Sequence, residues 1–232
     1  MIDVRASRPD APLFISPHLD DAVFACGEVM TSSVRSTVAT VFAGRPPAGA
    51  PFASWDADAG FRPGEDVIGA RREEDREALA ALGAHPVWLD FCDDQYGTGT
   101  SETELVEALA ALIERSEFGA VYLPLGLFHA DHVRASDAAL ALTTRFALPF
   151  RAYEDALYRR IPDLVAKRIE VLQGRGFRLS REEVPVEPEA HARKRDAVAC
   201  YRSQIRALAT RRGHADTFAR ESYWRVVRAD RA

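Results

Sequence analysis

The stretch LFISPHLDDAVFACG, residues 13–27, has the pattern of a strand, a polar turn and the start of a helix. Three apolar residues come first, a Ser-Pro pair interrupts them, and one histidine and two aspartates follow within four positions. In an open α/β sheet, ligands bind beyond the carboxyl ends of the strands. The side chains of His18, Asp20 and Asp21 are therefore predicted to serve chemistry rather than packing.

A helix cap is the alternative explanation for Asp20 or Asp21. Aspartate is favoured at the N-cap, and its charge interacts favourably with the positive end of the helix dipole. One aspartate is enough for that purpose, however, and two adjacent carboxylates repel each other unless a cation lies between them. The pair, with a histidine close by, therefore favours a metal site.

A second polar cluster follows another apolar run. Residues 120–124 are apolar, Gly126 comes shortly after them, and His129, Asp131 and His132 follow. The order of strand, turn and His-x-Asp-His repeats the order seen at residues 13–21. The two clusters are therefore predicted to lie at equivalent strand ends and to share one metal site.

Strands and helices alternate along the first two thirds of the chain. This alternation predicts an α/β fold with a Rossmann-like, mostly parallel sheet flanked by helices. A single domain is expected for residues 1–232, with its core at about 12–155 and a smaller, irregular C-terminal extension at about 156–232. Strands are predicted at 13–15, 37–43, 85–91, 120–124 and 152–154, an extended piece at 178–187, and helices at 22–33, 67–82, 102–116, 133–144, 161–173 and 189–208, before a tail whose Tyr223 and Trp224 dock on the core.

Composition excludes several classes of protein. The formal net charge of −5 argues against a nucleic-acid partner. No apolar stretch approaches the roughly 20 residues of a membrane span, and the first residues lack the apolar segment of a signal peptide, so a cytoplasmic protein is expected. The 3 cysteines form no C-x-x-C pair, which argues against a disulfide framework or a cysteine zinc site. No G-x-G-x-x-G follows the first strand, so a nucleotide cofactor is not implied.

The two clusters together resemble the signature pair of the PIG-L/LmbE-like family of zinc-dependent N-acetylglucosaminide deacetylases. Two further segments agree with this resemblance. Residues 71–83, which begin Arg-Arg-Glu-Glu, resemble the arginine-rich helix of the family, and residues 194–204, which end Tyr-Arg-Ser-Gln, resemble its late helix. The resemblance spans about residues 12–205. It departs at Leu19, where the commonest form of the family has proline, and this position carries no ligand atom.

The resemblance implies that His18, Asp21 and His132 are the metal ligands, with Zn²⁺ as the metal and Fe²⁺ as an alternative. Two histidines and one aspartate, with further positions open to water, form the catalytic rather than the structural pattern for zinc. The implied reaction removes an acetyl group from an N-acetylated amino sugar or its conjugate by attack of a metal-bound water. Asp20 is then the general base, and His129, kept protonated and oriented by Asp131, stabilises the oxyanion.

The partner implied by this resemblance is a small-molecule amino sugar, and homo-oligomerisation is left open. Arg71, Arg72 and Asp94 are the predicted substrate contacts, although Asp94 is equally suited to a turn. The long irregular loop 44–66 is predicted to cover the site. Its aromatic residues Phe52, Trp55 and Phe61 either contact a sugar ring or only fix the loop to the core.

Two other classes of function remain as alternatives. Two histidines and one carboxylate are also the ligands of non-haem Fe(II) enzymes, although such oxygenases usually require an all-β barrel. A non-catalytic binding protein with the same fold is the second alternative. The presence of both Asp20 and His129, which metal retention does not need, argues against it.

Overall fold

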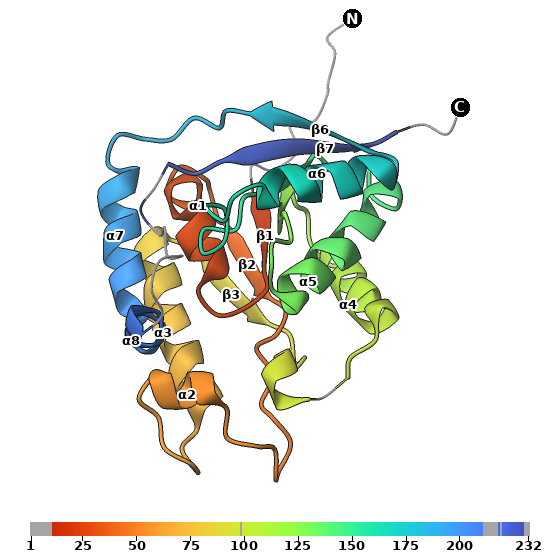
Figure 1. Cartoon of the computed structure of the whole chain (residues 1–232). Helices are drawn as coiled ribbons and strands as arrows, with labels where there is room; N and C mark the ends of the chain where they lie inside the picture. Colours follow the sequence, from red (N-terminus) through yellow and green to blue (C-terminus); the bar gives the residue numbers. More distant parts are fainter. Residues whose placement is uncertain (1–10, 98, 211–217, 219, 230–232) are drawn as a thin grey trace, which may run out of the picture.

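The computed structural model describes residues 11–97, 99–210, 218 and 220–229. Within these residues, 7 strands form one sheet in the order β3-β2-β1-β4-β5-β7-β6. In Figure 1, β1, β2 and β3 lie side by side, and β6 runs beside β7. The first five strands in this order are parallel, and β7 pairs antiparallel with both β5 and β6. The predicted α/β fold with a mostly parallel sheet is therefore confirmed. The polar, proline-containing residues 1–11 are predicted from the sequence to form a loosely held arm, and all of them except Ala11 lie outside the described residues.

The bounds of the elements follow the predictions closely in the first two thirds of the chain. The strands are β1 (Pro12–Ser16), β2 (Thr37–Thr40), β3 (His85–Trp88), β4 (Ala120–Pro124), β5 (Phe150–Tyr153), β6 (Phe177–Glu182) and β7 (Tyr223–Arg228). The helices are α1 (Asp21–Thr31), α2 (Ser54–Asp58), α3 (Val67–Leu82), α4 (Glu102–Glu114), α5 (Ala130–Ala141), α6 (Leu164–Gly174), α7 (Ala190–Cys200) and α8 (Arg202–Thr210).

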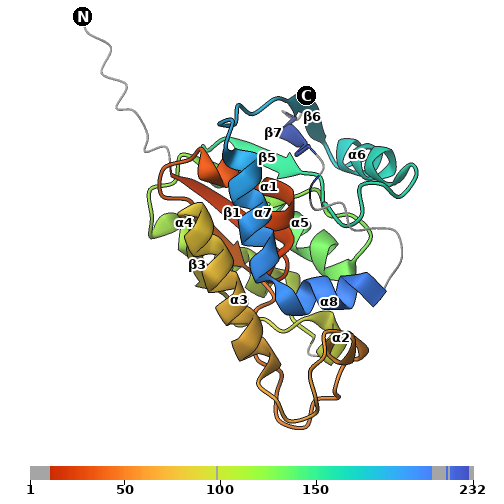
Figure 2. The ribbon, with the colours of Figure 1, turned by 90° about the vertical axis from the view of Figure 1, so that its left-hand side faces the viewer.

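Helices cover both faces of the sheet. Helices α1, α3 and α7 pack together on one face, and α4 and α5 pack together on the other (Figures 1 and 2). Strand β1 is buried along its whole length, and its alternating side chains contribute to both cores: Leu13 and Ile15 to one, and Phe14 to the other. Apolar residues on both faces of this strand are what a parallel sheet covered on two sides requires.

The topology determines where the two polar clusters lie. From β1 the chain crosses to β2 and then β3 on one side, whereas β4 and β5 lie on the other side of β1. The boundary between β1 and β4 is therefore a switch point of the sheet, and crevices open at the carboxyl ends of the strands at such points. The sequences His18–Asp21 and His129–His132 follow β1 and β4, so the fold brings both clusters to one crevice.

The predicted helix 189–208 is wrong as a single element, because two helices, α7 and α8, occupy it. Tyr201 separates them with φ −81° and ψ 57°. Its hydroxyl donates to Asp75 Oδ1 on α3 at 2.6 Å, and the Ser203 amide and hydroxyl donate to Glu74 at 3.0 and 2.6 Å. These contacts with α3 override the helical periodicity of the sequence.

Two further differences concern short elements. The predicted irregular loop 44–66 contains the one-turn helix α2, which lies beside α8 (Figure 2). The predicted docked tail is the strand β7, in which Tyr223 is buried and Trp224 is half-buried. Helix α4 begins with a capping box formed by Ser101 and Glu104. No helix in the described part of the chain is both long enough and apolar enough to cross a membrane.

Candidate metal and catalytic site

A cavity of about 410 Å³ lies at the carboxyl ends of β1 and β4. Polar groups from both predicted clusters form part of its lining, and aromatic and aliphatic side chains form much of the rest. The polar set is His18, Asp20, Asp21, Ser54, Arg71, Asp93, Gln95, His129, His132 and Gln204, and the apolar set includes Phe42, Trp55, Phe128, Leu157 and Tyr158. A site with a few converging polar groups and apolar walls is typical of pockets for small molecules.

The turn after β1 is held by hydrogen bonds among its own residues. The Ser16 hydroxyl donates to His18 O at 2.6 Å and accepts the Ala22 amide at 3.0 Å, and the His18 amide donates to Asp21 Oδ2 at 2.9 Å. Asp20 precedes α1 with φ 156° and ψ −36°, a conformation that residues other than glycine rarely adopt. Its side chain makes no capping hydrogen bond. The capping explanation therefore does not account for Asp20.

The structure brings the three predicted ligands together. Asp21 Oδ2 lies 3.2 Å from His18 Nδ1 and 3.1 Å from His132 Nε2. The donor atoms of these residues all lie within 4.8 Å of one another. The histidine nitrogens and the carboxylate oxygen match the donors that zinc prefers, so this set fits a divalent metal ion. His18 also belongs to a second group of suitable spacing, with His129 and Asp131.

Each of the two histidines in this set has a carboxylate beside its other ring nitrogen. Asp131 Oδ2 lies 3.3 Å from His18 Nε2, and Asp155 Oδ1 lies 2.6 Å from His132 Nδ1. Asp155 is held in turn by the amides of Gly126 and Leu127, which donate to its Oδ2 at 3.0 and 3.2 Å. Carboxylates placed in this way fix the tautomer and orientation of metal-binding histidines.

Asp155 was not among the predicted site residues. It follows β5 by two positions, as His18 follows β1 by two, so the strand-end rule applied to this third strand would have identified it. Asp155 and His132 are 23 positions apart, so no local sequence motif links them.

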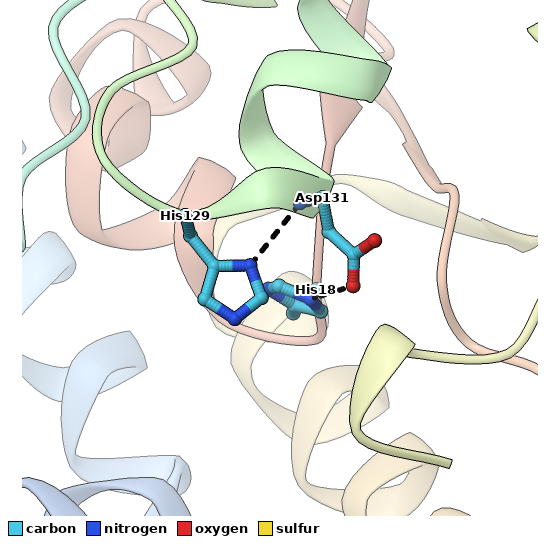
Figure 3. Close-up of side chains that lie close together, drawn as sticks. All are labelled: His18, His129 and Asp131. Atoms are coloured by element: carbon cyan, nitrogen blue, oxygen red, sulfur yellow. Dashed lines mark hydrogen bonds and ion pairs between the residues drawn. The ribbon is translucent and has the colours of Figure 1, made fainter. Parts of the chain in front are cut away.

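The tautomer of His129 follows from its position at the N-cap of α5. Its Nδ1 accepts the Asp131 amide at 3.2 Å, as Figure 3 shows, so in the neutral ring the proton lies on Nε2. Burial lowers the pKa of His129, and the neighbouring His18 and His132 lower it further. The charge of Asp131 acts to raise this pKa, as predicted, but the net shift is downward, which favours the neutral ring.

The carboxylate of Asp131 has partners other than His129. Its carboxylate contacts His18, accepts the Asp94 amide at 3.0 Å and pairs with Arg134 at 3.0 Å. Its backbone amide donates to the ring of His129 (Figure 3). Asp131 thus orients His129 through the backbone and His18 through the side chain.

The adjacent carboxylates of Asp20 and Asp21 have pKa shifts in opposite directions. Burial raises the pKa of Asp20 well above its usual range, and the charge of Asp21 raises it further. Burial also acts to raise the pKa of Asp21, but His132 and His18 outweigh burial and lower it. Two acids whose pKa values are shifted apart are suited to different tasks, because one remains ionised while the other exchanges protons.

His132 has a raised pKa because it lies between two carboxylates. Burial acts to lower it, but the carboxylates of Asp21 and Asp155 raise it to about 9. A proton on this ring therefore takes the place of a cation between two buried acids.

Of the two arginines predicted to contact substrate, one lines the cavity and the other does not. Arg71 is buried and lines the cavity, where its Nη2 lies 2.9 Å from Asp56 Oδ1. The guanidinium of Arg72 instead donates to Ala43 O at 3.0 and 2.8 Å and pairs with Asp90, and this residue does not line the cavity. The predicted contact at Arg72 is therefore not supported.

The turn 93–97 contributes through a different aspartate from the predicted one. The carboxylate of Asp93 lines the cavity and lies 3.7 Å from His18 Nε2. Asp94 is exposed and supplies only its amide to Asp131. Of the three aromatic residues predicted in the loop, Trp55 lines the cavity, Phe52 does not, and Phe61 packs against Arg71.

Comparisons with known proteins agree with the geometry. The PIG-L family, described as GlcNAc-PI de-N-acetylase, matches residues 13–143, more than half of the chain. No curated protein sequence matches the chain.

Solved structures of deacetylases resemble the whole chain. The triple-mutant deacetylase of the teicoplanin biosynthetic pathway is 28% identical with a TM-score of 0.77, and the match covers 96% of this chain and 100% of that one. The A40926 pseudoaglycone deacetylase Dbv21 is 29% identical with a TM-score of 0.77, over 96% and 99% of the two chains. The zinc-inhibited form of teicoplanin deacetylase Orf2 is 26% identical with a TM-score of 0.75, over 96% and 100%.

Proposed function

We propose that this chain, which belongs to the PIG-L family, is a metal-dependent hydrolase that removes an acetyl group from an N-acetylated amino sugar or its conjugate. The observation that carries the proposal is the meeting of His18, Asp21 and His132 beside a carboxylate, Asp20, that serves neither as a cap nor as a member of the donor set. Metal retention alone does not require Asp20.

His18, Asp21 and His132 would hold the metal, and zinc is the metal we propose, with Fe²⁺ as an alternative. A divalent cation bound here would act as a Lewis acid and would lower the pKa of water in the site. It would also relieve the repulsion between Asp20 and Asp21, which burial makes severe. The α/β sheet is not the all-β barrel expected for the oxygenase alternative.

Asp20 is the general base in this proposal. It takes the proton from the attacking water as the bond to the acetamide carbonyl carbon forms, and the proton then passes to the leaving amine. Asp20 lines the same cavity as the three proposed ligands, so its carboxylate lies where a base for the attacking water is needed. The products are a free amino sugar and acetate.

His129 is the oxyanion stabiliser in this proposal, and it acts as a neutral donor. Its Nε2–H is the ring donor left for substrate, because Nδ1 accepts the Asp131 amide. A positioned N–H in a site shielded from water stabilises developing negative charge more than it stabilises the substrate carbonyl.

The variant His129→Ala is expected to reduce kcat by about 10²–10³-fold, the usual cost of removing an oxyanion donor. Metal content should stay at the wild-type level, because the proposed ligands are other residues. Steady-state kinetics and metal analysis on one preparation check this result. An unchanged kcat would rule out the role.

Arg71 is the proposed substrate contact. Its Nε and Nη2 are buried and make no hydrogen bond of good geometry within the described residues, although Asp56 balances its charge. Trp55 and Tyr158 line the same cavity and offer aromatic surfaces for a sugar ring. The family description supports an N-acetylated amino sugar as the group that is deacetylated. The antibiotic-pathway deacetylases that the chain resembles support a substrate in which this sugar is attached to a larger molecule.

The test of the function is release of acetate from a panel of N-acetylglucosamine derivatives, including the free sugar, an aryl glycoside and an inositol phospholipid conjugate. The protein is assayed loaded with zinc and stripped by a chelator. We expect release only with metal, restored when zinc is added back. Release that survives complete removal of metal, or its absence from every derivative, would contradict the proposal.

A further inference from the structure

Gln204 joins two parts of the cavity wall that are far apart in the sequence. This residue, on α8, is buried. Its Oε1 accepts the indole N–H of Trp55 at 3.0 Å, and its Nε2 donates to Asp20 Oδ2 at 3.2 Å. Trp55 lies on α2, within the loop 44–66, and α2 and α8 lie side by side (Figures 1 and 2).

The indole determines which way the amide of Gln204 points. An indole nitrogen can only donate a hydrogen bond, so the amide oxygen must face Trp55 and the amide NH₂ must face Asp20. The opposite orientation would place two NH donors together and an oxygen against a carboxylate. Without Trp55, the amide could rotate or exchange its partner for water.

The hydrogen bond from Gln204 leaves one oxygen of Asp20 available. Among the described residues, Gln204 is the hydrogen-bond donor to this carboxylate, and it uses Oδ2. The backbone at Asp20 has an unfavourable conformation, with φ 156°, so local structure alone does not favour this placement. A donor on Oδ2 therefore orients the carboxylate and directs Oδ1 away from α8.

Helix α8 is itself fixed from the opposite side. Glu74 accepts the amide and hydroxyl of Ser203, and Asp75 accepts the hydroxyl of Tyr201, so two acids of α3 hold the start of α8. All four side chains are buried. Gln204 is thus presented from a rigid support, whereas Trp55 is presented from a one-turn helix in a long loop. Loops of this length are often mobile elements near sites.

We infer that Gln204 is a positioning residue that couples the loop 44–66, through Trp55, to the carboxylate of Asp20. The base is held in its working orientation when Trp55 is seated against Gln204. The loop therefore affects the reaction through Asp20 as well as through contacts with substrate. This inference rests on the proposed role of Asp20 as general base.

Three variants test the coupling by kinetics. Gln204→Leu should lower kcat about tenfold, the usual effect of removing a hydrogen bond to a charged group. Trp55→Phe should lower kcat about threefold, because the amide of Gln204 can still donate to Asp20 part of the time. The double variant should be no slower than Gln204→Leu, and KM should change less than twofold in all three. Independent, multiplicative losses would overturn the inference.

The variant Gln204→Glu separates positioning from simple anchoring. It keeps the shape of the side chain and the acceptor for Trp55, but it presents an oxygen to Asp20 in place of NH₂. Positioning predicts a loss of kcat at least as large as that of Gln204→Leu. A merely structural anchor predicts nearly wild-type kcat, and that result would overturn the inference.

Trp224→Phe is the matched control. Trp224, like Trp55, donates its indole N–H to a side-chain oxygen, here the carboxylate of Glu154 at 3.0 Å, but it lies on β7 and does not line the cavity. This variant should keep wild-type kcat. Hydrogen exchange of residues 53–60 should become faster in Gln204→Leu and stay unchanged in Trp224→Phe, a readout that needs no activity. Unchanged exchange in Gln204→Leu would contradict the inference.

Failure of the inference and failure of the proposed function give different results. If Asp20→Asn is inactive but Gln204→Glu behaves as wild type, the base assignment stands and the coupling is overturned. If Asp20→Asn keeps wild-type activity, the proposed mechanism is wrong, and the exchange measurement then tests the seating of Trp55 by itself.

Discussion

The variant Asp20→Asn is expected to lose about 10²–10⁴-fold of kcat, the usual contribution of a positioned general base. An asparagine has the same shape, and its amide oxygen can still accept the hydrogen bond from Gln204. It cannot take up the proton of the attacking water at neutral pH. The chemical step should therefore fail while the architecture of the site persists.

Metal content distinguishes this loss from damage to the metal site. Asp21, the proposed ligand, is held independently by the His18 amide and by the ring of His132. Removal of the neighbouring charge at Asp20 should leave the affinity for zinc near the wild-type value. Elemental analysis and kcat are measured on the same preparation. Loss of metal would mean that the base and the ligand had been exchanged in the assignment.

The control for this variant is Asp94→Asn. It makes the same chemical change in the turn 93–97, which follows β3 at the same edge of the sheet. The Asp94 side chain is exposed, however, and does not line the cavity. Only its amide contacts the site, at Asp131. Wild-type kcat is expected, and a loss comparable to that of Asp20→Asn would show that the assay reports general damage.

Sequence alone was sufficient to predict the convergence of the two clusters. Each cluster directly follows a buried strand, and alternation with helices makes the strands parallel. Parallel strands present their carboxyl ends at one edge, so His18, Asp21 and His132 could be predicted to meet without knowledge of any side-chain contact.

The partners of these residues could not be predicted in the same way. Asp131 and His18 are 113 positions apart, and Gln204 and Asp20 are 184 apart. Such contacts depend on side-chain direction and on how the helices pack, and no local spacing encodes them. The break at Tyr201, which aims Gln204 at the site, arises from contacts with α3 and interrupts a sequence that is locally suited to one helix.

The limit of prediction from sequence is clearest where two adjacent residues are chemically alike. Successive residues on an α-helix point about 100° apart, so only one of Arg71 and Arg72 can face the cavity. The charge pattern of α3 does not decide which one does. At the turn 93–97, the same ambiguity led to the prediction of Asp94 in place of Asp93.

The variant His132→Ala should lose the metal itself. His132 is buried, with Nε2 3.1 Å from Asp21 and Nδ1 2.6 Å from Asp155, so its removal deletes one ligand and leaves the buried carboxylate of Asp155 without its histidine partner. Loss of an orienting partner alone usually costs about 10–100-fold in metal affinity. We expect a loss of about 100-fold or more for His132→Ala, and about 10–100-fold for Asp155→Asn.

Competition with protons gives this prediction a pH dependence. The pKa of His132 is about 9 without metal, so a metal ion must displace a proton from the ring at neutral pH. Apparent affinity for zinc should rise with pH up to about that value and level off above it. In Asp155→Asn the pKa of His132 falls, because an acid beside the ring is lost, so affinity should level off at a lower pH. An affinity independent of pH would contradict this account.

Two histidine controls determine which donor group holds the metal. His85→Ala makes the same change at an exposed position of β3 and should keep full affinity. His129→Ala removes a member of the second group, formed with His18 and Asp131, and should also keep it if the ion lies between His18, Asp21 and His132. In the second group, the Asp131 carboxylate already accepts the Asp94 amide and pairs with Arg134, which leaves it a weaker ligand than Asp21. Retention of metal in His132→Ala together with its loss in His129→Ala would reverse the assignment and would make His129 a ligand instead of the oxyanion donor.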